Sequence, residues 1–406
     1  MDSFDPKSLQ KEFPWFAAHK GSVYLDSAAT ALTPQCVIDA ITTFYQEQYA
    51  TIHRSVYPQA TALTEEYEKV RAKTQQFLGA ASASEIVFTK GTTESLNLVA
   101  SSYGRAFLQK GDAVLITQTE HHANIVPWQL ICKEREAQLL ICPVDAEGYV
   151  IEAEYRKRLR ENVKIVSMAH VSNVTGSIQP IQRLCALAQE VGAIFVVDGA
   201  QSTPHIPINV QELGVDFYAC SSHKAYGPMG VGILYGKRGH LENMPPYQSG
   251  GDMVDVVHFE QTTFQKPPLK FEAGTPMIGG ILGWGAALEF LQRIRQQGCL
   301  AYEAALNQYA AQQLATLKGM TRWGDPQGQT AIHAFTLQGV HPMDIGTLLG
   351  AQNICVRTGN LCAQPGLHFY QQEYVIRLST AAYTTKEDID RCTTALSSLV
   401  EEYSLL

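Results

Sequence analysis

Short apolar runs alternate with amphipathic stretches along most of the chain. Four runs have the length and apolar content of buried strands: residues 85–89, 113–117, 163–168 and 193–197. Between the last two, apolar residues recur at helical spacing over residues 181–191. Short apolar strands separated by helices are typical of a mainly parallel sheet covered on both faces. Ligands bind such sheets beyond the carboxyl ends of the strands, so the residues that follow each strand are the first candidates for a site.

The pattern changes after about residue 290. Two long helical stretches, 283–295 and 301–317, precede strands that we expect at residues 331–337 and 374–379. A helix-start signal then predicts a last helix over residues 385–403. This order of helices and strands after residue 290 indicates a smaller α+β domain.

The length of 406 residues is sufficient for two domains with large cores. We therefore predict an α/β protein. Its large domain, residues 20–290, has a mainly parallel mixed sheet covered by helices. Residues 1–19 and 291–406 form the smaller domain.

Charge and cysteine content narrow the class of protein. The formal net charge is −8 and no basic run stands out, so we expect no nucleic-acid partner. We also expect no membrane partner, because no apolar run approaches the length of a membrane span. The first residues lack the pattern of a secretory signal. The nine cysteines show no metal-finger spacing and suit a reducing compartment, so we predict a cytoplasmic protein.

The most informative segment is residues 215–232, where an apolar strand ends in Ser221-Ser222-His223-Lys224 and a glycine-rich turn. A lysine at the mouth of a sheet is partly desolvated, which disfavours its ammonium form and frees the amine to attack a carbonyl. Most lysines are instead solvated surface residues, so the interpretation depends on the other post-strand segments. The cofactor that uses such a lysine is pyridoxal 5′-phosphate, held as a Schiff base.

Three other post-strand segments have the matching chemistry. Residues 90–95 open a helix with glycine and threonine, and the free N–H groups there suit a phosphate; a threonine N-cap is the alternative. His121 can stack on an aromatic ring and transfer protons. We expect no metal, because adjacent histidines such as His121 and His122 point in different directions and no third ligand is evident. Asp198 can pair with a protonated pyridine nitrogen, although capping the next helix is the commoner use of such a residue.

A second candidate centre lies in the smaller domain. Cys362 stands among small, polar and turn-forming residues, so we expect an exposed, mobile thiol, with Arg357 as a nearby cation that favours the nucleophilic thiolate. The other eight cysteines are expected to be buried and structural. Arg377, on the next predicted strand, can hold a carboxylate through its bidentate fork, with a surface salt bridge as the alternative.

These segments resemble the cysteine desulfurases, in particular the SufS/CsdA group of the class V aminotransferase family. The resemblance covers nearly the whole chain and implies the fold type I of pyridoxal-phosphate-dependent transferases. The matching blocks are residues 24–30, 53–54, 91–94, 120–124, 170–176, 198–201, 222–224 and 271–276.

The resemblance implies a role for each matched residue. Catalytic roles are implied for Lys224, Cys362 and His121. Cofactor contacts are implied for Thr93, His121, Asp198, Gln201, Ser221, His223, Lys224 and, from the other subunit of a homodimer, Thr275. Substrate-side contacts are implied for Asn173, Arg377, His53 and Arg357.

The implied reaction converts L-cysteine to L-alanine. Its sulfur passes to Cys362 as a persulfide and then to an acceptor, such as a SufE-like protein, for iron–sulfur or related cofactor assembly. Selenocysteine lyase, cysteine-sulfinate desulfinase and aminotransferase are alternatives with the same cofactor. A catalytically silent partner protein is an alternative from another class, and it is disfavoured because every residue of the implied set is present.

Two positions depart from the family pattern. The family usually has one or two histidines directly before the reactive cysteine, where this chain has Asn360 and Leu361. It often has arginine where this chain has Lys270, which keeps the charge but not the bidentate hydrogen bonding.

Overall fold

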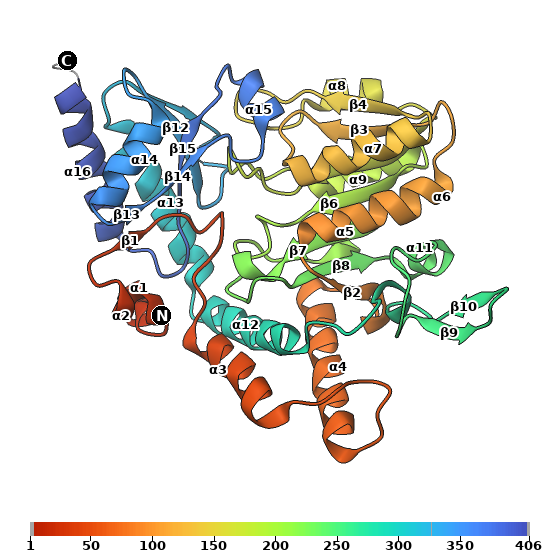
Figure 1. The fold of residues 1–406 in the computed structure, drawn as a ribbon. Helices are drawn as coiled ribbons and strands as arrows, with labels where there is room; N and C mark the ends of the chain where they lie inside the picture. The colour runs from red at the N-terminus through yellow and green to blue at the C-terminus, as the bar shows by residue number, and fades with distance from the viewer. Residues whose placement is uncertain (1–3, 326, 404–406) are drawn as a thin grey trace.

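A seven-stranded sheet forms the centre of the larger lobe in the computed structural model, which describes residues 4–325 and 327–403 (Figure 1). Only β8 runs antiparallel to its neighbours, so the carboxyl ends of the other six strands meet at one edge. The spatial order is β2 (Ile86–Thr89), β8 (Gly232–Gly236), β7 (Phe217–Ser221), β6 (Ile194–Asp198), β5 (Val163–Ala169), β3 (Ala113–Thr117) and β4 (Gln138–Cys142).

The predicted α/β class and mainly parallel sheet are confirmed. β3 spans the predicted residues, β6 is shifted by one residue at both ends, and the other predicted strands differ by one residue at one end. Strand β2 begins at Ile86, because Glu85 belongs to a capping box with Ser82.

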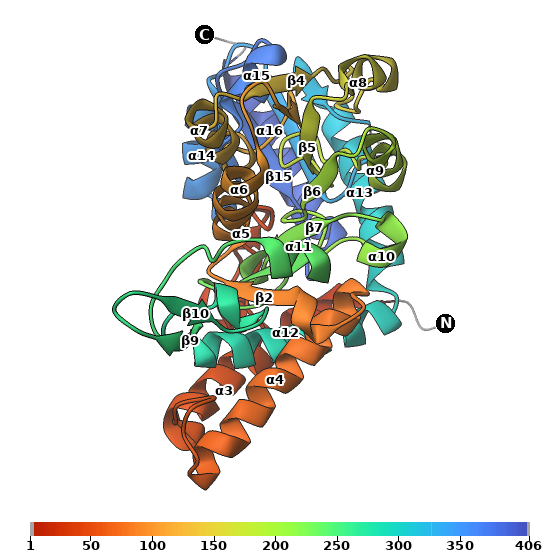
Figure 2. The same ribbon diagram turned by 90° about the vertical axis from the view of Figure 1, so that its right-hand side faces the viewer.

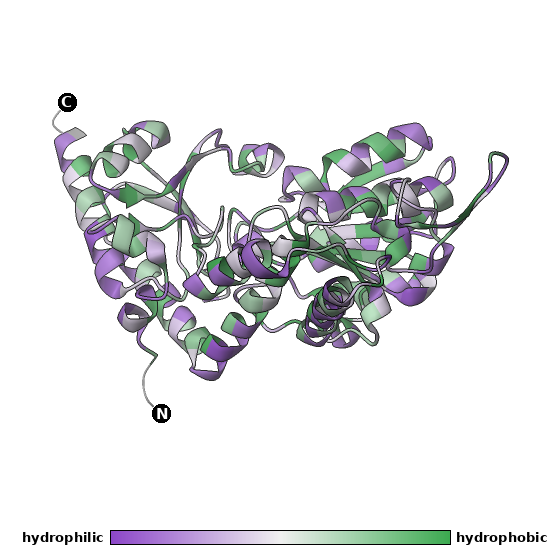
Figure 3. Cartoon of the chain, turned by 60° about the horizontal axis from the view of Figure 1, so that its bottom comes forward, coloured by the Kyte–Doolittle hydropathy of each residue, from purple (hydrophilic) through white to green (hydrophobic). Residues whose placement is uncertain are grey.

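Helices cover both faces of this sheet (Figure 2). Helices α5 (Thr92–Leu98) and α7 (Val126–Glu134) pack on one face, and α8 (Glu152–Arg158) and α9 (Ile181–Glu190) on the other. Successive side chains of β6 enter opposite cores: Val196 packs with the α5 and α7 side chains, whereas Phe195 and Val197 pack with those of α9. This two-sided burial explains why the strands are continuously apolar, and the hydropathy colouring shows apolar strands inside helices with polar outer faces (Figure 3).

The smaller lobe contains a four-stranded antiparallel sheet. Its order is β11 (Met320–Trp323), β12 (Ile332–Leu337), β15 (Val375–Ser379) and β14 (Arg357–Gly359). It is accompanied by α13 (Cys299–Ala315), α14 (Pro342–Ala351), α15 (Gln364–Phe369) and α16 (Lys386–Tyr403).

The two lobes are connected by α12 (Ile278–Gln296) and by the N-terminal segment, whose strand β1 (Val23–Tyr24) pairs in parallel with β13 (Ile354–Cys355). The domain boundaries given above stay a prediction, and residues 1–3, 326 and 404–406 lie outside the described part of the chain.

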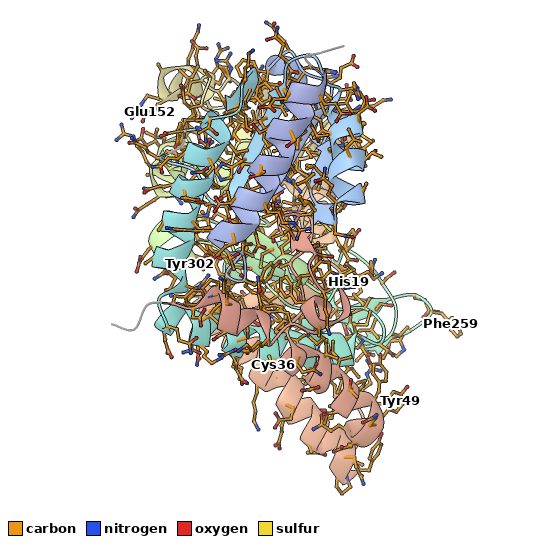
Figure 4. The ribbon with its side chains drawn as sticks, turned by 90° about the vertical axis from the view of Figure 1, so that its left-hand side faces the viewer. His19, Cys36, Tyr49, Glu152, Phe259 and Tyr302 are labelled. Atoms are coloured by element: carbon orange, nitrogen blue, oxygen red, sulfur yellow. The ribbon has the colours of Figure 1, made fainter. Side chains whose placement is uncertain are left out.

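The remaining elements lie mostly at the periphery. A hairpin of β9 (Val254–Val257) and β10 (Thr262–Phe264) projects from the larger lobe, with the exposed Phe259 at its end (Figure 4). The remaining helices are α1 (Pro6–Gln10), α2 (Pro14–Ala18), α3 (Gln35–Thr43), α4 (Pro58–Leu78), α6 (Arg105–Phe107), α10 (Val210–Leu213) and α11 (Arg238–Asn243). Among the described residues, none of the helices combines the length and apolar character required of a membrane span.

Candidate active site

A cavity of about 260 Å³ lies between the carboxyl edge of the large sheet and the four-stranded sheet. This volume is near the lower end of that of small-molecule sites, about 300 Å³. It brings together most of the predicted site residues: Thr93, His121, Asn173, Asp198, Gln201, Ser221, His223, Lys224, Arg357, Cys362 and Arg377.

The turn after β2 leaves backbone donors free at the cavity wall. The N-cap of α5 is Gly91, which has no side-chain capping bond, so the alternative of a simple threonine cap is wrong. The N–H and hydroxyl of Thr92 both contact Ser221 Oγ, at 2.8 and 2.7 Å, and this fixes the turn against the end of β7. Because no side chain caps this helix, the first-turn N–H groups that follow Thr92, together with the positive dipole end of α5, suit an anion.

Lys224 and Asp198 lie at the ends of neighbouring strands on this wall. Burial lowers the pKa of Lys224 to about 8, and the carboxylate of Asp198 partly opposes this effect. Lys224 is half-buried at the cavity wall, which agrees with the predicted partial desolvation of the lysine. Asp198 is 5% exposed, and burial raises the pKa of its carboxyl group. It accepts a hydrogen bond from Ala200 N at 3.0 Å in a turn, and the next helix, α10, is capped by Asn209, so the helix-capping alternative is wrong for Asp198, which lines the cavity instead.

His121 is held as a neutral ring. Burial and, to a smaller extent, the nearby Lys224 cation lower the pKa of His121 to about 4. Nδ1 accepts a hydrogen bond from Ala123 N at 3.1 Å, which places the proton of the neutral ring on Nε2. The turn itself is fixed by the buried carboxylate of Glu120, which accepts from Asn124 Nδ2 at 2.7 Å and from Ala169 N at 2.9 Å.

Arg377 is only 4% exposed, so the surface-salt-bridge alternative is wrong for it. Its Nη1 donates to Asn173 O at 3.1 Å and its Nη2 contacts Asp26 Oδ1 at 3.4 Å, whereas Nε has no partner. Gln201 similarly donates to Ala28 O and leaves Oε1 buried without a partner. Buried polar atoms are rarely left unpaired, so both atoms indicate that a polar ligand belongs in this cavity.

Cys362 is exposed, as predicted, and its neighbour Leu361 also lines the cavity. The prediction that all other cysteines are buried is wrong for two of them. Cys36 lies on α3 (Figure 4) and is exposed, because the core-facing residue in the first turn of that helix is Val37. Cys355 is half-buried on the short strand β13.

Two predicted residues lie away from this cavity in the single chain. His53 contacts Glu68 at 3.0 Å, and Thr275 lines a separate cavity beside Tyr67. Lys270, at the position where the family often has arginine, donates to the carbonyl of Glu242 at the end of α11.

Sequence reasoning did not single out several residues of the site, among them Asp26, Thr92 and Leu361. Asp26 and Thr92 lie inside segments that resemble the cysteine desulfurases, residues 24–30 and 91–94, so this resemblance could have identified them. The position of Leu361 depends on the tertiary fold.

Comparisons with known proteins show the family and the fold of the chain. Residues 23–392 match the class-V aminotransferase family. A probable cysteine desulfurase of Halalkalibacterium halodurans is 45% identical over 94% of both chains, and a cysteine desulfurase of Yersinia pseudotuberculosis is 41% identical over 98% of both. The crystal structure of the cysteine desulfurase CsdA from Escherichia coli superposes with a TM-score of 0.92 at 38% identity, covering 99% of this chain and 100% of that one. The cysteine desulfurase of Thermococcus onnurineus gives 0.94 at 33% identity with the same coverage.

Proposed function

This chain belongs to the cysteine desulfurases of the class V aminotransferase family, and from that premise we propose that it uses pyridoxal 5′-phosphate to release sulfur from L-cysteine, leaving L-alanine. The main support for this proposal is that one cavity combines a desolvated lysine, a buried aspartate, a buried arginine and an exposed cysteine. No single lobe contains all four groups.

The chemistry of the cavity fits this cofactor. The free N–H groups at the start of α5, with Thr93, Ser221 and His223, suit its phosphate. Asp198 suits its pyridine nitrogen, and the amine of Lys224 suits its aldehyde. When bound, the cofactor supplies an electron sink for bonds that break at the substrate α-carbon.

Different side chains of the cavity have different roles in the reaction. Arg377 binds the substrate carboxylate, with Asn173 beside it. The neutral amine of Lys224 removes the proton from the substrate α-carbon. His121, with its proton on Nε2, would lie against the cofactor and supply a proton from that nitrogen.

Cys362 takes the sulfur. Its thiolate forms an S–S bond to the substrate sulfur while the substrate C–S bond breaks and leaves its electron pair on carbon. Protonation of that carbon completes L-alanine, and the enzyme retains a persulfide. An acceptor of the SufE-like kind would then remove the terminal sulfur, because Cys362 is exposed at the mouth of the cavity.

We further propose a homodimer located in the cytoplasm. His53 and Thr275 are matched residues that lie outside the cavity of their own chain, which supports a role toward a second subunit. The exposed apolar side chains Val256, Val257 and Phe259 of the β9–β10 hairpin offer a surface for such contact.

The pKa of Lys224 predicts the pH dependence of cofactor attachment. Only the neutral amine attacks an aldehyde, and burial lowers the pKa of Lys224 from 10.5 to about 8. Mixing cofactor-free protein with pyridoxal 5′-phosphate in a stopped-flow spectrometer should give an attachment rate that rises through pH 8 and levels off near pH 9. A rate that keeps rising tenfold per pH unit up to pH 10 would show an ordinary solvated lysine.

Gly232 lies against Gly91, in the turn after β2 that we propose binds the cofactor phosphate, so a side chain at residue 232 would displace this turn. A Cβ atom there would lie 2.3 Å from the N and Cα atoms of Gly91. Gly232→Ala should therefore weaken cofactor binding by about tenfold or more, the effect of losing one charge-assisted hydrogen bond, in an absorbance titration. Gly239→Ala is the matched control, because nothing lies within 4 Å of its Cβ position. Equal affinities in the two variants would contradict the placement of the phosphate.

The direct test of the activity is product analysis. The purified protein, loaded with pyridoxal 5′-phosphate and supplied with L-cysteine and a thiol reductant, should form L-alanine and sulfide in equal amounts. An aminotransferase would instead form a keto acid and convert its cofactor to the amine form. Absence of alanine under these conditions would overturn the proposal.

A further inference from the structure

The loop that carries Cys362, here called the cysteine loop (residues 360–363), has an unfavourable backbone conformation. Leu361 and Cys362 are consecutive non-glycine residues with positive φ angles of 52° and 55°. Such angles cost free energy and persist only when surrounding contacts impose them. The contacts of this loop therefore determine where the thiol lies.

Part of the restraint comes from the two residues that replace the usual histidines. Cys362 N donates to Asn360 Oδ1 at 3.0 Å. Leu361 is 5% exposed and packs with Val174 and Leu367, and its carbonyl accepts from Asn173 Nδ2 at 2.8 Å. The loop is thus anchored by an apolar side chain on one side and by the larger lobe on the other.

The remaining restraint comes from His122, on the turn after β3 in the larger lobe. Its backbone N–H donates to Cys362 O at 2.8 Å. Its ring Nε2 accepts from the backbone N–H of Gln364 at 3.1 Å. Gln364 is the first residue of α15, and no N-cap side chain satisfies the start of that helix. The imidazole therefore supplies an acceptor that the local sequence lacks.

This arrangement requires a neutral ring with its proton on Nδ1. Burial lowers the pKa of His122 below its ordinary value of 6.5, so the acceptor is present at neutral pH. The two neighbouring histidines thus have opposite tautomers: His121 accepts through Nδ1, and His122 accepts through Nε2.

We propose that His122 is a positioning residue for the reaction, which holds the cysteine loop across the two lobes through Cys362 O and Gln364 N so that the thiol stays at the cavity. The inference rests on the proposed function, because it concerns the reach of Cys362 to substrate sulfur. Neither contact touches the residues assigned to the cofactor or to the substrate carboxylate. Loss of the ring acceptor should therefore affect sulfur transfer and not cofactor binding.

The test compares two substitutions in the cofactor-loaded enzyme. His122→Phe keeps the backbone N–H and a flat aromatic ring but removes the acceptor. His122→Gln retains an acceptor oxygen at similar reach. His122→Phe should lower kcat for L-cysteine about fivefold, the effect of one lost hydrogen bond, with KM and the cofactor spectrum unchanged; His122→Gln should restore most of the loss.

Alkylation provides a readout that does not depend on turnover. Without substrate, iodoacetamide should modify Cys362 faster in His122→Phe than in His122→Gln, as mapped by peptide mass spectrometry. Cys36, the other exposed cysteine among the described residues, serves as the reference within each molecule and should react equally in both variants.

Two results would overturn the positioning role: equal kcat and equal Cys362 alkylation in both variants, or a loss of kcat in both accompanied by an altered cofactor spectrum. Failure of the unmodified enzyme to form alanine would instead contradict the proposed function. An active unmodified enzyme with an unaffected His122→Phe variant would contradict the positioning role alone.

Discussion

Replacing Lys224 with alanine is expected to lower desulfurase turnover by about 10³-fold and to abolish covalent attachment of the cofactor. The side chain is the amine beside Asp198 at the carboxyl edge of the sheet, and its lowered pKa makes it both nucleophile and base. Removal eliminates both roles at once. Alanine formation and mass spectrometry of the borohydride-reduced protein measure the two losses separately.

Two controls make this result specific. Lys133→Ala removes an exposed lysine at the end of α7 and should leave turnover unchanged. A small added amine should restore part of the activity of Lys224→Ala, since it can replace the missing base. Turnover within tenfold of the unmodified enzyme would mean that the reactive amine lies elsewhere.

Replacing Cys362 with serine should reduce sulfur release from L-cysteine by about 10²-fold or more and leave earlier steps intact. A serine hydroxyl is protonated at neutral pH and does not attack sulfur as a thiolate does. Exchange of the substrate α-proton with D₂O, followed by NMR, should persist because it depends on Lys224 and Arg377.

The same variant distinguishes between substrates. L-cysteine sulfinate and selenocysteine carry leaving groups that depart more readily, so their turnover should fall far less in Cys362→Ser than that of L-cysteine. Cys36→Ser is the control, since this exposed cysteine lies on α3 outside the cavity. An equal loss for all three substrates would contradict the assignment of Cys362 as the sulfur acceptor.

Much of the larger lobe could be predicted because its sheet is buried on both faces. That burial makes each strand a continuous apolar run, and β3 was predicted to the residue. A continuous apolar run does not show whether its strand is parallel or antiparallel to its neighbours, so the reversed orientation of β8 could not be predicted. The rule that sites follow parallel strands located His121, Asp198 and Lys224 because their strands end at one edge.

Parts of the site that depend on contacts between residues far apart in the sequence could not be predicted from the sequence. Asp26 reaches Arg377 only because the segment after β1 lies beside the end of β15, 351 residues further along the chain. Leu361 reaches the cavity through a left-handed backbone that propensity disfavours. The role of Thr275 stays a prediction, because its expected partner is a second chain. The substrate-side role of His53 also stays a prediction, because this residue lies outside the cavity of its own chain.

Intact-protein and peptide mass spectrometry after a single turnover tests the central claim most directly. Cofactor-loaded enzyme mixed with one equivalent of L-cysteine, without reductant, should gain one sulfur atom on the peptide containing Cys362 and release one equivalent of L-alanine. Alanine without added sulfur on Cys362, or added sulfur on another cysteine, would contradict the account.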